Sequence, residues 1–163
     1  MKSVLEKIDL YKQSLANVID RKKLWAEVKK PLIQQTLKEI QQSTNLDWSV
    51  QVLDDKTTPE AVNIHFHQSA SGIIEVTDTS QRHLIKRGGA LIFSQGHNGS
   101  IYVFCTFPYV EIWVNQQDAK VFEKVDPSLI TKDFVIKQVE KFLDEMRNWE
   151  DTSSMTRIGF NVT

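Results

Sequence analysis

Two histidines in the middle of the chain, His65 and His67, have a spacing that could bind a metal ion. They lie in a segment where apolar and polar residues alternate, so on a strand both imidazoles would leave the same face. Imidazoles on one face can converge on a cation such as zinc. The next acidic residue, Glu75, is too far along the chain to complete such a set. A solvated strand face is therefore favoured, and the metal pair is the alternative.

The single cysteine, Cys105, could act as a nucleophile only beside a base that stabilises its thiolate. Its neighbours Val103, Phe104 and Phe107 predict an apolar site, where burial leaves a thiol inert. We predict a packed core cysteine. With no second cysteine in the sequence, no disulfide within the chain is expected.

Four acidic residues in the middle of the chain offer a further route to hydrolysis. Asp54, Asp55, Glu75 and Asp78 could hold a divalent cation and support attack by water. Adjacent acids in a loop more commonly form turns. A small metal-dependent hydrolase that uses His65, His67 and nearby acids is thus kept as an alternative hypothesis and not as the leading one. The sequence predicts no catalytic set and no cofactor.

Two basic segments could bind anions. Residues 86–89, Lys-Arg-Gly-Gly, could present backbone N–H groups, but no phosphate-binding glycine motif accompanies them. Residues 21–30, RKKLWAEVKK, place Trp25 among lysines and an arginine, and we expect Trp25 to pack inward with Val28. The whole chain has 20 basic and 21 acidic residues, a net charge of -1. Nucleic-acid binders usually carry a basic surplus, so weak anion or nucleic-acid binding is the least favoured hypothesis.

The composition is that of an ordinary globular protein, with 40% hydrophobic and 25% charged residues among 163. We expect one domain spanning residues 1–163. Glu6, Lys7 and Asp9 interrupt the apolar stretch that a signal peptide would need. No apolar window is long enough to span a bilayer. These features predict a cytoplasmic protein without a membrane segment.

Residues 1–43 are predicted to be helical, because apolar residues recur there at three- and four-residue steps. Two arrangements are possible, and the pattern slightly favours the first. One is a helical hairpin that turns near Asp20-Arg21. The other is one long helix, kinked at Pro31.

Alternating segments from 47 to 125 predict a mainly antiparallel, meander-like sheet of about six strands. Asn98-Gly99 predicts a tight hairpin, and residues 100–107 predict a central strand with no wet face. Pro108 should mark either a bulge or the start of a new strand, and Val110, Ile112 and Val114 follow it in an alternating pattern. A helix over 127–149 should pack on the sheet, followed by a tail at 150–163. The fold class is therefore α+β.

The N-terminal segment carries the strongest functional indication. Val4, Ile8, Tyr11, Leu15 and Val18 repeat at alternating four- and three-residue steps, the spacing of a helix–helix seam. The leading hypothesis is a noncatalytic partner- or ligand-binding module that self-associates through this region. The ligand-binding residues are not predicted.

Overall fold

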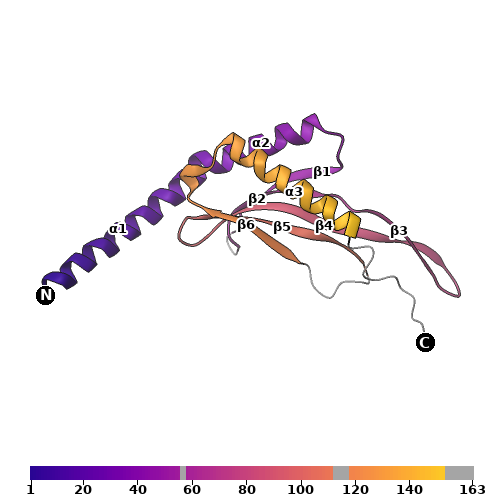
Figure 1. The fold of residues 1–163 in the computed structure, drawn as a ribbon, viewed down its shortest axis with the longest axis horizontal. Helices are drawn as coiled ribbons and strands as arrows, with labels where there is room; N and C mark the ends of the chain where they lie inside the picture. The colour runs from indigo at the N-terminus through magenta and orange to yellow at the C-terminus, as the bar shows by residue number, and fades with distance from the viewer. Residues whose placement is uncertain (56–57, 112–117, 153–163) are drawn as a thin grey trace.

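The computed structural model describes residues 1–55, 58–111 and 118–152 (Figure 1). The chain opens with one long helical run that consists of α1 (Lys2–Leu24), a π-helical turn (Trp25–Lys29) and α2 (Lys30–Ser43). The hairpin near Asp20-Arg21 does not form, and the long-helix alternative does. Pro31 is the second residue of α2 and directly follows the π-helical turn, so the regular α-helical ladder is interrupted just before the proline.

The π-helical turn gives Trp25 and Val28 different environments. A π-turn inserts one residue into the helical repeat and so changes which side chains share a face. Trp25 is fully buried, and its Nε1 donates a hydrogen bond to Glu60 at 3.0 Å. Val28 is 49% exposed. The expectation that both pack inward is therefore correct for Trp25 and wrong for Val28.

The described strands form one six-stranded sheet, and every pair of neighbouring strands is antiparallel. Its order is β1-β2-β4-β5-β6, while β3 pairs with the first part of β4. β2 and β3 therefore follow one another along the same edge of the long strand β4. The strands are β1 (Trp48–Leu53), β2 (Ala61–Phe66), β3 (Ser69–Val76), β4 (Gln81–Gln95), β5 (Ile101–Val110) and β6 (Ala119–Val125).

β5 continues through Pro108 in an unchanged register with β4, where the sequence predicts a bulge or a new strand. Pro108 pairs with Gly88 of β4, and Gly88 and Gly89 both have positive φ values. A Cβ on Gly89 would lie 3.2 Å from Cγ of Pro108, so the missing side chain makes room for the ring. Val110 ends β5, and Ile112 and Val114 lie outside the described residues.

α2 and α3 lie on one face of the sheet (Figure 1). α3 (Lys132–Thr152) follows a short 3-10 turn (Pro127–Leu129) and packs on the sheet beside α2. The core includes a stack of Trp48, Phe66 and Phe142, with ring centroids 5.7 and 5.6 Å apart. Cys105 is part of this core, and burial raises the pKa of its thiol to about 11. The prediction of a packed core cysteine is confirmed.

The opposite face of the sheet carries the alternate residues of each strand. On β5, Ile101, Val103 and Cys105 are buried, whereas Tyr102 and Phe104 are half-buried. The strand thus has one buried face and one partly exposed face. We call this partly exposed side of the sheet, opposite the helices, the open face.

Candidate functional site

A group of polar side chains lies on the open face where β1 pairs with β2. The antiparallel register sets Trp48 against Phe66 and Ser49 against His65. Because Trp48 and Phe66 point into the core, Ser49 and His65 point away from it. Asp47 lies beside His67 just past the strand ends, where the His67 N–H donates to the Asp47 carbonyl at 3.0 Å.

These side chains form one hydrogen-bonded chain, which we call the polar ladder: Asp47, His67, Ser49, His65 and Asn63. Asp47 Oδ1 lies 2.6 Å from His67 Nδ1. His67 Nε2 lies 2.9 Å from Ser49 Oγ. On the other side of the hydroxyl, His65 Nε2 lies 3.2 Å from Oγ, and His65 Nδ1 lies 3.1 Å from Asn63 Oδ1. A carboxylate, an imidazole and a hydroxyl are therefore joined in that order.

The ladder allows two proton arrangements, because Ser49 has one proton and an imidazole on each side. If His67 is neutral and donates to Asp47 through Nδ1, its Nε2 accepts the Ser49 proton, and His65 donates to Oγ through Nε2. If His67 is charged, both its nitrogens donate, and Ser49 donates to His65. The Asn63 amide can present either its oxygen or its nitrogen to His65 Nδ1, so both arrangements satisfy every group.

Burial and charge favour a neutral His65. Its pKa is lowered, first by partial burial and second by the neighbouring His67. A neutral imidazole has one N–H and one acceptor nitrogen, which suits a position between a hydroxyl and an amide. Asp47 and His67 are more open to water, with side chains 80% and 46% exposed.

The predicted metal pair, His65 and His67, lies on one face, with ring centroids 6.0 Å apart and an edge-on orientation. Both Nε2 atoms are directed at Ser49 Oγ. Across residues 1–55, 58–111 and 118–152, no three His, Cys, Asp or Glu side chains form a group that could hold a metal ion. The metal site remains a prediction.

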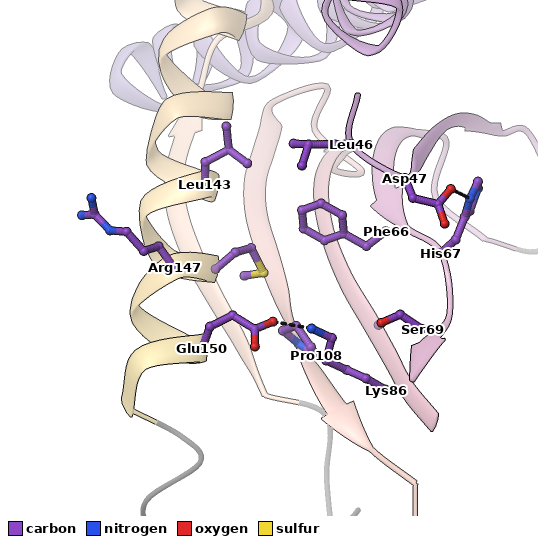
Figure 2. A pocket seen from close by; sticks show the side chains of 12 residues that line it. Leu46, Asp47, Phe66, His67, Ser69, Lys86, Pro108, Leu143, Arg147 and Glu150 are labelled. Carbon is purple, nitrogen blue, oxygen red and sulfur yellow. Dashed lines mark hydrogen bonds and ion pairs between the residues drawn. The ribbon is translucent and has the colours of Figure 1, made fainter. Parts of the chain in front are cut away.

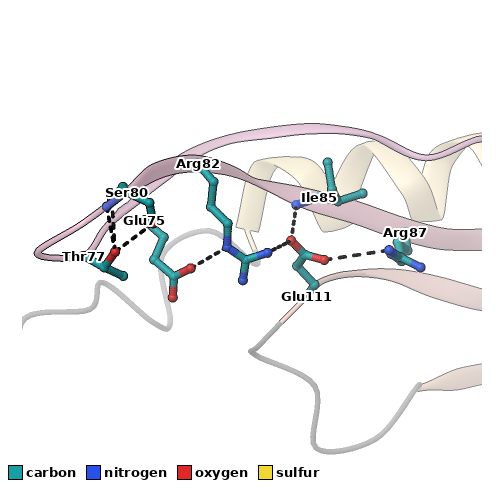
Figure 3. A network of polar contacts seen from close by, with 7 residues as sticks. All are labelled: Glu75, Thr77, Ser80, Arg82, Ile85, Arg87 and Glu111. Atoms are coloured by element: carbon teal, nitrogen blue, oxygen red, sulfur yellow. Dashed lines mark hydrogen bonds and ion pairs between the residues drawn. The ribbon is translucent and has the colours of Figure 1, made fainter.

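Two of the acids proposed for a hydrolase, Asp54 and Glu75, take part in separate ion pairs. Asp54 pairs with Lys30 at 2.6 Å. Glu75 pairs with Arg82 at 2.6 Å, in a network that continues to Glu111 and Arg87 (Figure 3). This network ties the β3–β4 hairpin to the end of β5. Asp78 lies in the turn between β3 and β4.

The basic segments are also engaged within the chain. Lys86 pairs with Glu150 of α3. In the segment 21–30, Arg21 pairs with Asp126 at 2.6 Å, and Lys29 donates to the Ile130 carbonyl at 2.7 Å. Lys30 reaches both Asp54 and Glu60. These contacts occupy cations that anion binding would require.

A pocket of about 310 Å³ lies between α3 and the sheet, beside the polar ladder (Figure 2). Its interior is mainly apolar, and its lining includes Leu46, Phe66, Leu143 and Met146. Asp47 and His67 form its margin opposite α3. The Lys86–Glu150 ion pair spans from the sheet to α3 at another part of the margin. A pocket of this size and lining could accept a small apolar group.

Besides the polar ladder and the pocket, α1 forms a further exposed surface, which projects away from the sheet (Figure 1). Every residue from 1 to 17 is exposed. The exposed fractions of the large apolar side chains are Val4 56%, Leu5 57%, Ile8 43%, Leu10 62%, Tyr11 65% and Leu15 48%. Ile19, one turn further on, is 67% exposed. The apolar stripe predicted from spacing is thus present and uncovered within one copy of the described chain.

Comparison of the chain with protein-family models, curated proteins and solved structures gave no match. Within the described residues, no helix is both long enough and apolar enough to cross a membrane. No signal in the sequence singles out Ser49. Its position beside His67 depends on the β1–β2 register, which sequence spacing does not specify.

Proposed function

We propose that the protein is a self-associating partner-binding module, and that the first part of α1, residues 2–19, is its contact surface. The observation that carries the proposal is the exposed apolar stripe. Apolar patches beyond a few hundred Å² are rarely left uncovered on monomers. A protein surface that matches the stripe would stabilise this part of the helix.

The lack of packing on residues 2–17 supports a partner. Most helical stability in proteins comes from packing of an apolar face rather than from intrinsic helix propensity. Residues 2–17 have no buried side chain. Full burial of an aliphatic side chain contributes about 1.5–3 kcal/mol. Because the stripe residues are still partly exposed, burying them against a partner would add part of this free energy to association.

A second copy of this chain is the proposed partner. Val4, Ile8, Tyr11, Leu15 and Val18 follow the alternating four- and three-residue steps with which one helix packs along another. A two-fold dimer brings the same stripe from each copy together, so one surface covers both. Leu5 and Ile19 flank this seam and would widen the contact.

Light scattering coupled to size exclusion tests the proposal on the full chain. We expect a mass of twice 18.8 kDa at micromolar loading. A double variant, Ile8→Lys with Leu15→Lys, places two charges in the seam and should give the monomer mass. Its circular dichroism should retain the sheet and the attached helices.

The matched control is Gln13→Lys with Asn17→Lys. These two residues are hydrogen-bonded to each other on another face of α1, at 3.0 Å. The control adds the same charge but should remain a dimer. A mass of 18.8 kDa for the unmodified chain at every loading would refute self-association. Equal dissociation of both double variants would show that charge, not the stripe, controls the mass.

A further inference from the structure

We propose that Ser49 is a nucleophile, activated by His67 and positioned by the polar ladder, that attacks the carbonyl carbon of small carboxylic esters. The observation is the unbroken chain Asp47–His67–Ser49, with distances of 2.6 and 2.9 Å. The inference does not depend on self-association, because the ladder lies on the sheet and the stripe lies on α1.

Each ladder residue has a distinct role. His67 Nε2 accepts the proton of Ser49 Oγ and is the general base. Asp47 is a positioning residue: it accepts from His67 Nδ1, which fixes the tautomer whose Nε2 is free. His65 lies on the other side of Oγ, 3.2 Å away. In the arrangement with a neutral His67, His65 carries its N–H on Nε2 and can donate to the carbonyl oxygen of a bound ester.

The reaction transfers the acyl group from the ester to Ser49. Oγ forms a bond to the carbonyl carbon while its proton moves to His67 Nε2, and the π electron pair moves onto the carbonyl oxygen. When that pair returns, the bond to the leaving oxygen breaks, and the leaving group takes the proton from His67. Water then repeats the same steps on the acyl-serine, which releases the carboxylic acid and restores Ser49.

The position of the ladder determines which esters fit. The site is on an exposed sheet face, so the substrate need not enter an enclosed cavity. Asp47 is 80% exposed, and water weakens the electrostatic effect of its carboxylate. General-base assistance therefore belongs at the low end of its usual range, about 10²-fold. Small esters with good leaving groups, which require the least stabilisation of the leaving oxygen, are the substrate class.

Two probes test the proposal on the full chain. p-Nitrophenyl acetate should release p-nitrophenolate, and a fluorophosphonate should form a stable bond to Oγ with loss of fluoride. Peptide mass spectrometry should locate that adduct on Ser49. His67→Ala should slow Ser49 labelling by about 10²-fold. Asp47→Asn should slow labelling, and Asp47→Glu should restore part of the rate, which a purely structural role would not require.

Matched controls keep the test specific. Ser94 is another half-buried serine, opposite Ala61 in the same sheet, and Ser94→Ala should label at the normal rate. His83→Ala, an exposed histidine on β4, should do the same. Circular dichroism and melting temperature confirm that each variant is folded.

Three results would overturn the proposal. One is the absence of an adduct on Ser49 in the folded protein. Another is an equal labelling rate in His67→Ala, which would mean that the hydroxyl is not activated. The third is a rise in melting temperature with zinc that disappears in a His65→Ala, His67→Ala double variant. That result would assign the two histidines to a metal ion.

Discussion

The long N-terminal helix has two parts with the same kind of pattern and opposite environments. In residues 25–43, Trp25, Ile33 and Leu37 are fully buried against the sheet and α3. In residues 2–17, apolar side chains recur at similar steps, and none is buried. An amphipathic pattern therefore predicts which face of a helix is apolar, but it does not predict whether the same chain covers that face.

The boundary between the two parts lies near Val18–Lys22. There the β4–β5 hairpin contacts the helix closely, since a Cβ on Gly99 would lie 2.6 Å from Cβ of Arg21. The Arg21–Asp126 ion pair holds the same stretch to the loop before α3. Everything N-terminal to this boundary extends beyond the sheet (Figure 1).

The largest effect on stability should come from Trp25→Ala in the attached part. It removes a fully buried indole and leaves Glu60 without the Nε1 hydrogen bond. Truncation of a buried aromatic side chain costs about 3–5 kcal/mol. Urea unfolding followed by circular dichroism measures the loss. A loss below about 1 kcal/mol would mean that the attached part is not packed as described.

Gly99→Ala should have the next largest effect, because it tests the boundary itself. Gly99 has a φ of +80°, and its new Cβ would meet Arg21 and the Val18 carbonyl. Backbone strain and the clash together should destabilise the protein by about 2 kcal/mol.

Gly72→Ala is the matched control for the Gly99 variant. Gly72 has a φ of +81°, but nothing lies within 4 Å of a Cβ built there. The Gly72→Ala variant should lose only about 1 kcal/mol of unfolding free energy, from backbone strain alone. The difference between the two urea midpoints measures the contact of the hairpin with α1. Equal losses at the two glycines would remove Gly99 from the boundary.

The sequence predicts local features of the fold well, because local chemistry specifies them. Asn98-Gly99 predicts the β4–β5 turn, and residues 100–107 predict a central strand with no wet face. β5 does lie between β4 and β6, with one face buried and the other half-buried. The prediction of a helical hairpin near Asp20-Arg21 is wrong for a different reason. No local signal distinguishes a turn at Asp20-Arg21 from a continuous helix with a π-turn. The contact that fixes the π-turn region, Trp25 with Glu60, joins residues far apart in the sequence.

The polar ladder shows the same limit at the candidate site. His65 and His67 can be placed on one face from their spacing alone. Ser49 and Asp47 reach them only through the register in which Ser49 faces His65. The segment that joins β1 and β2 contains no short hairpin motif that would fix this register. A shift by one residue would move Ser49 to the opposite face.

A smaller effect is expected from Asp126→Asn, which weakens the second contact at the boundary. The pKa of Asp126 is lowered, first by the Ser128 hydroxyl and backbone N–H, and then by Arg21. Its side chain is 36% exposed, so the ion pair should contribute about 0.5–1 kcal/mol.

The pH dependence of this variant has a definite sign. A folded pKa below the unfolded value means that the ionised carboxylate favours folding. The contribution is fully present above the unfolded pKa near 3.8 and is lost as the pH falls through the lower folded pKa. The unfolding free energies of the two proteins should therefore differ at neutral pH and converge as the solution is acidified below about pH 4. A difference that persists in acid would indicate that the introduced amide itself disturbs the turn.

The smallest effect on the isolated chain should come from Tyr11→Ser in the projecting part. Tyr11 is 65% exposed, so at the lowest protein concentration its replacement should change the free energy of unfolding by less than about 0.5 kcal/mol. The dimer adds a concentration-dependent contribution, because a partner that binds only the folded state raises the melting temperature. Calorimetry over a range of concentrations should give a rising melting temperature for the unmodified protein and a flatter rise for Tyr11→Ser. A large loss at the lowest concentration would instead place Tyr11 in contact with its own chain, and the two parts of the helix would no longer differ.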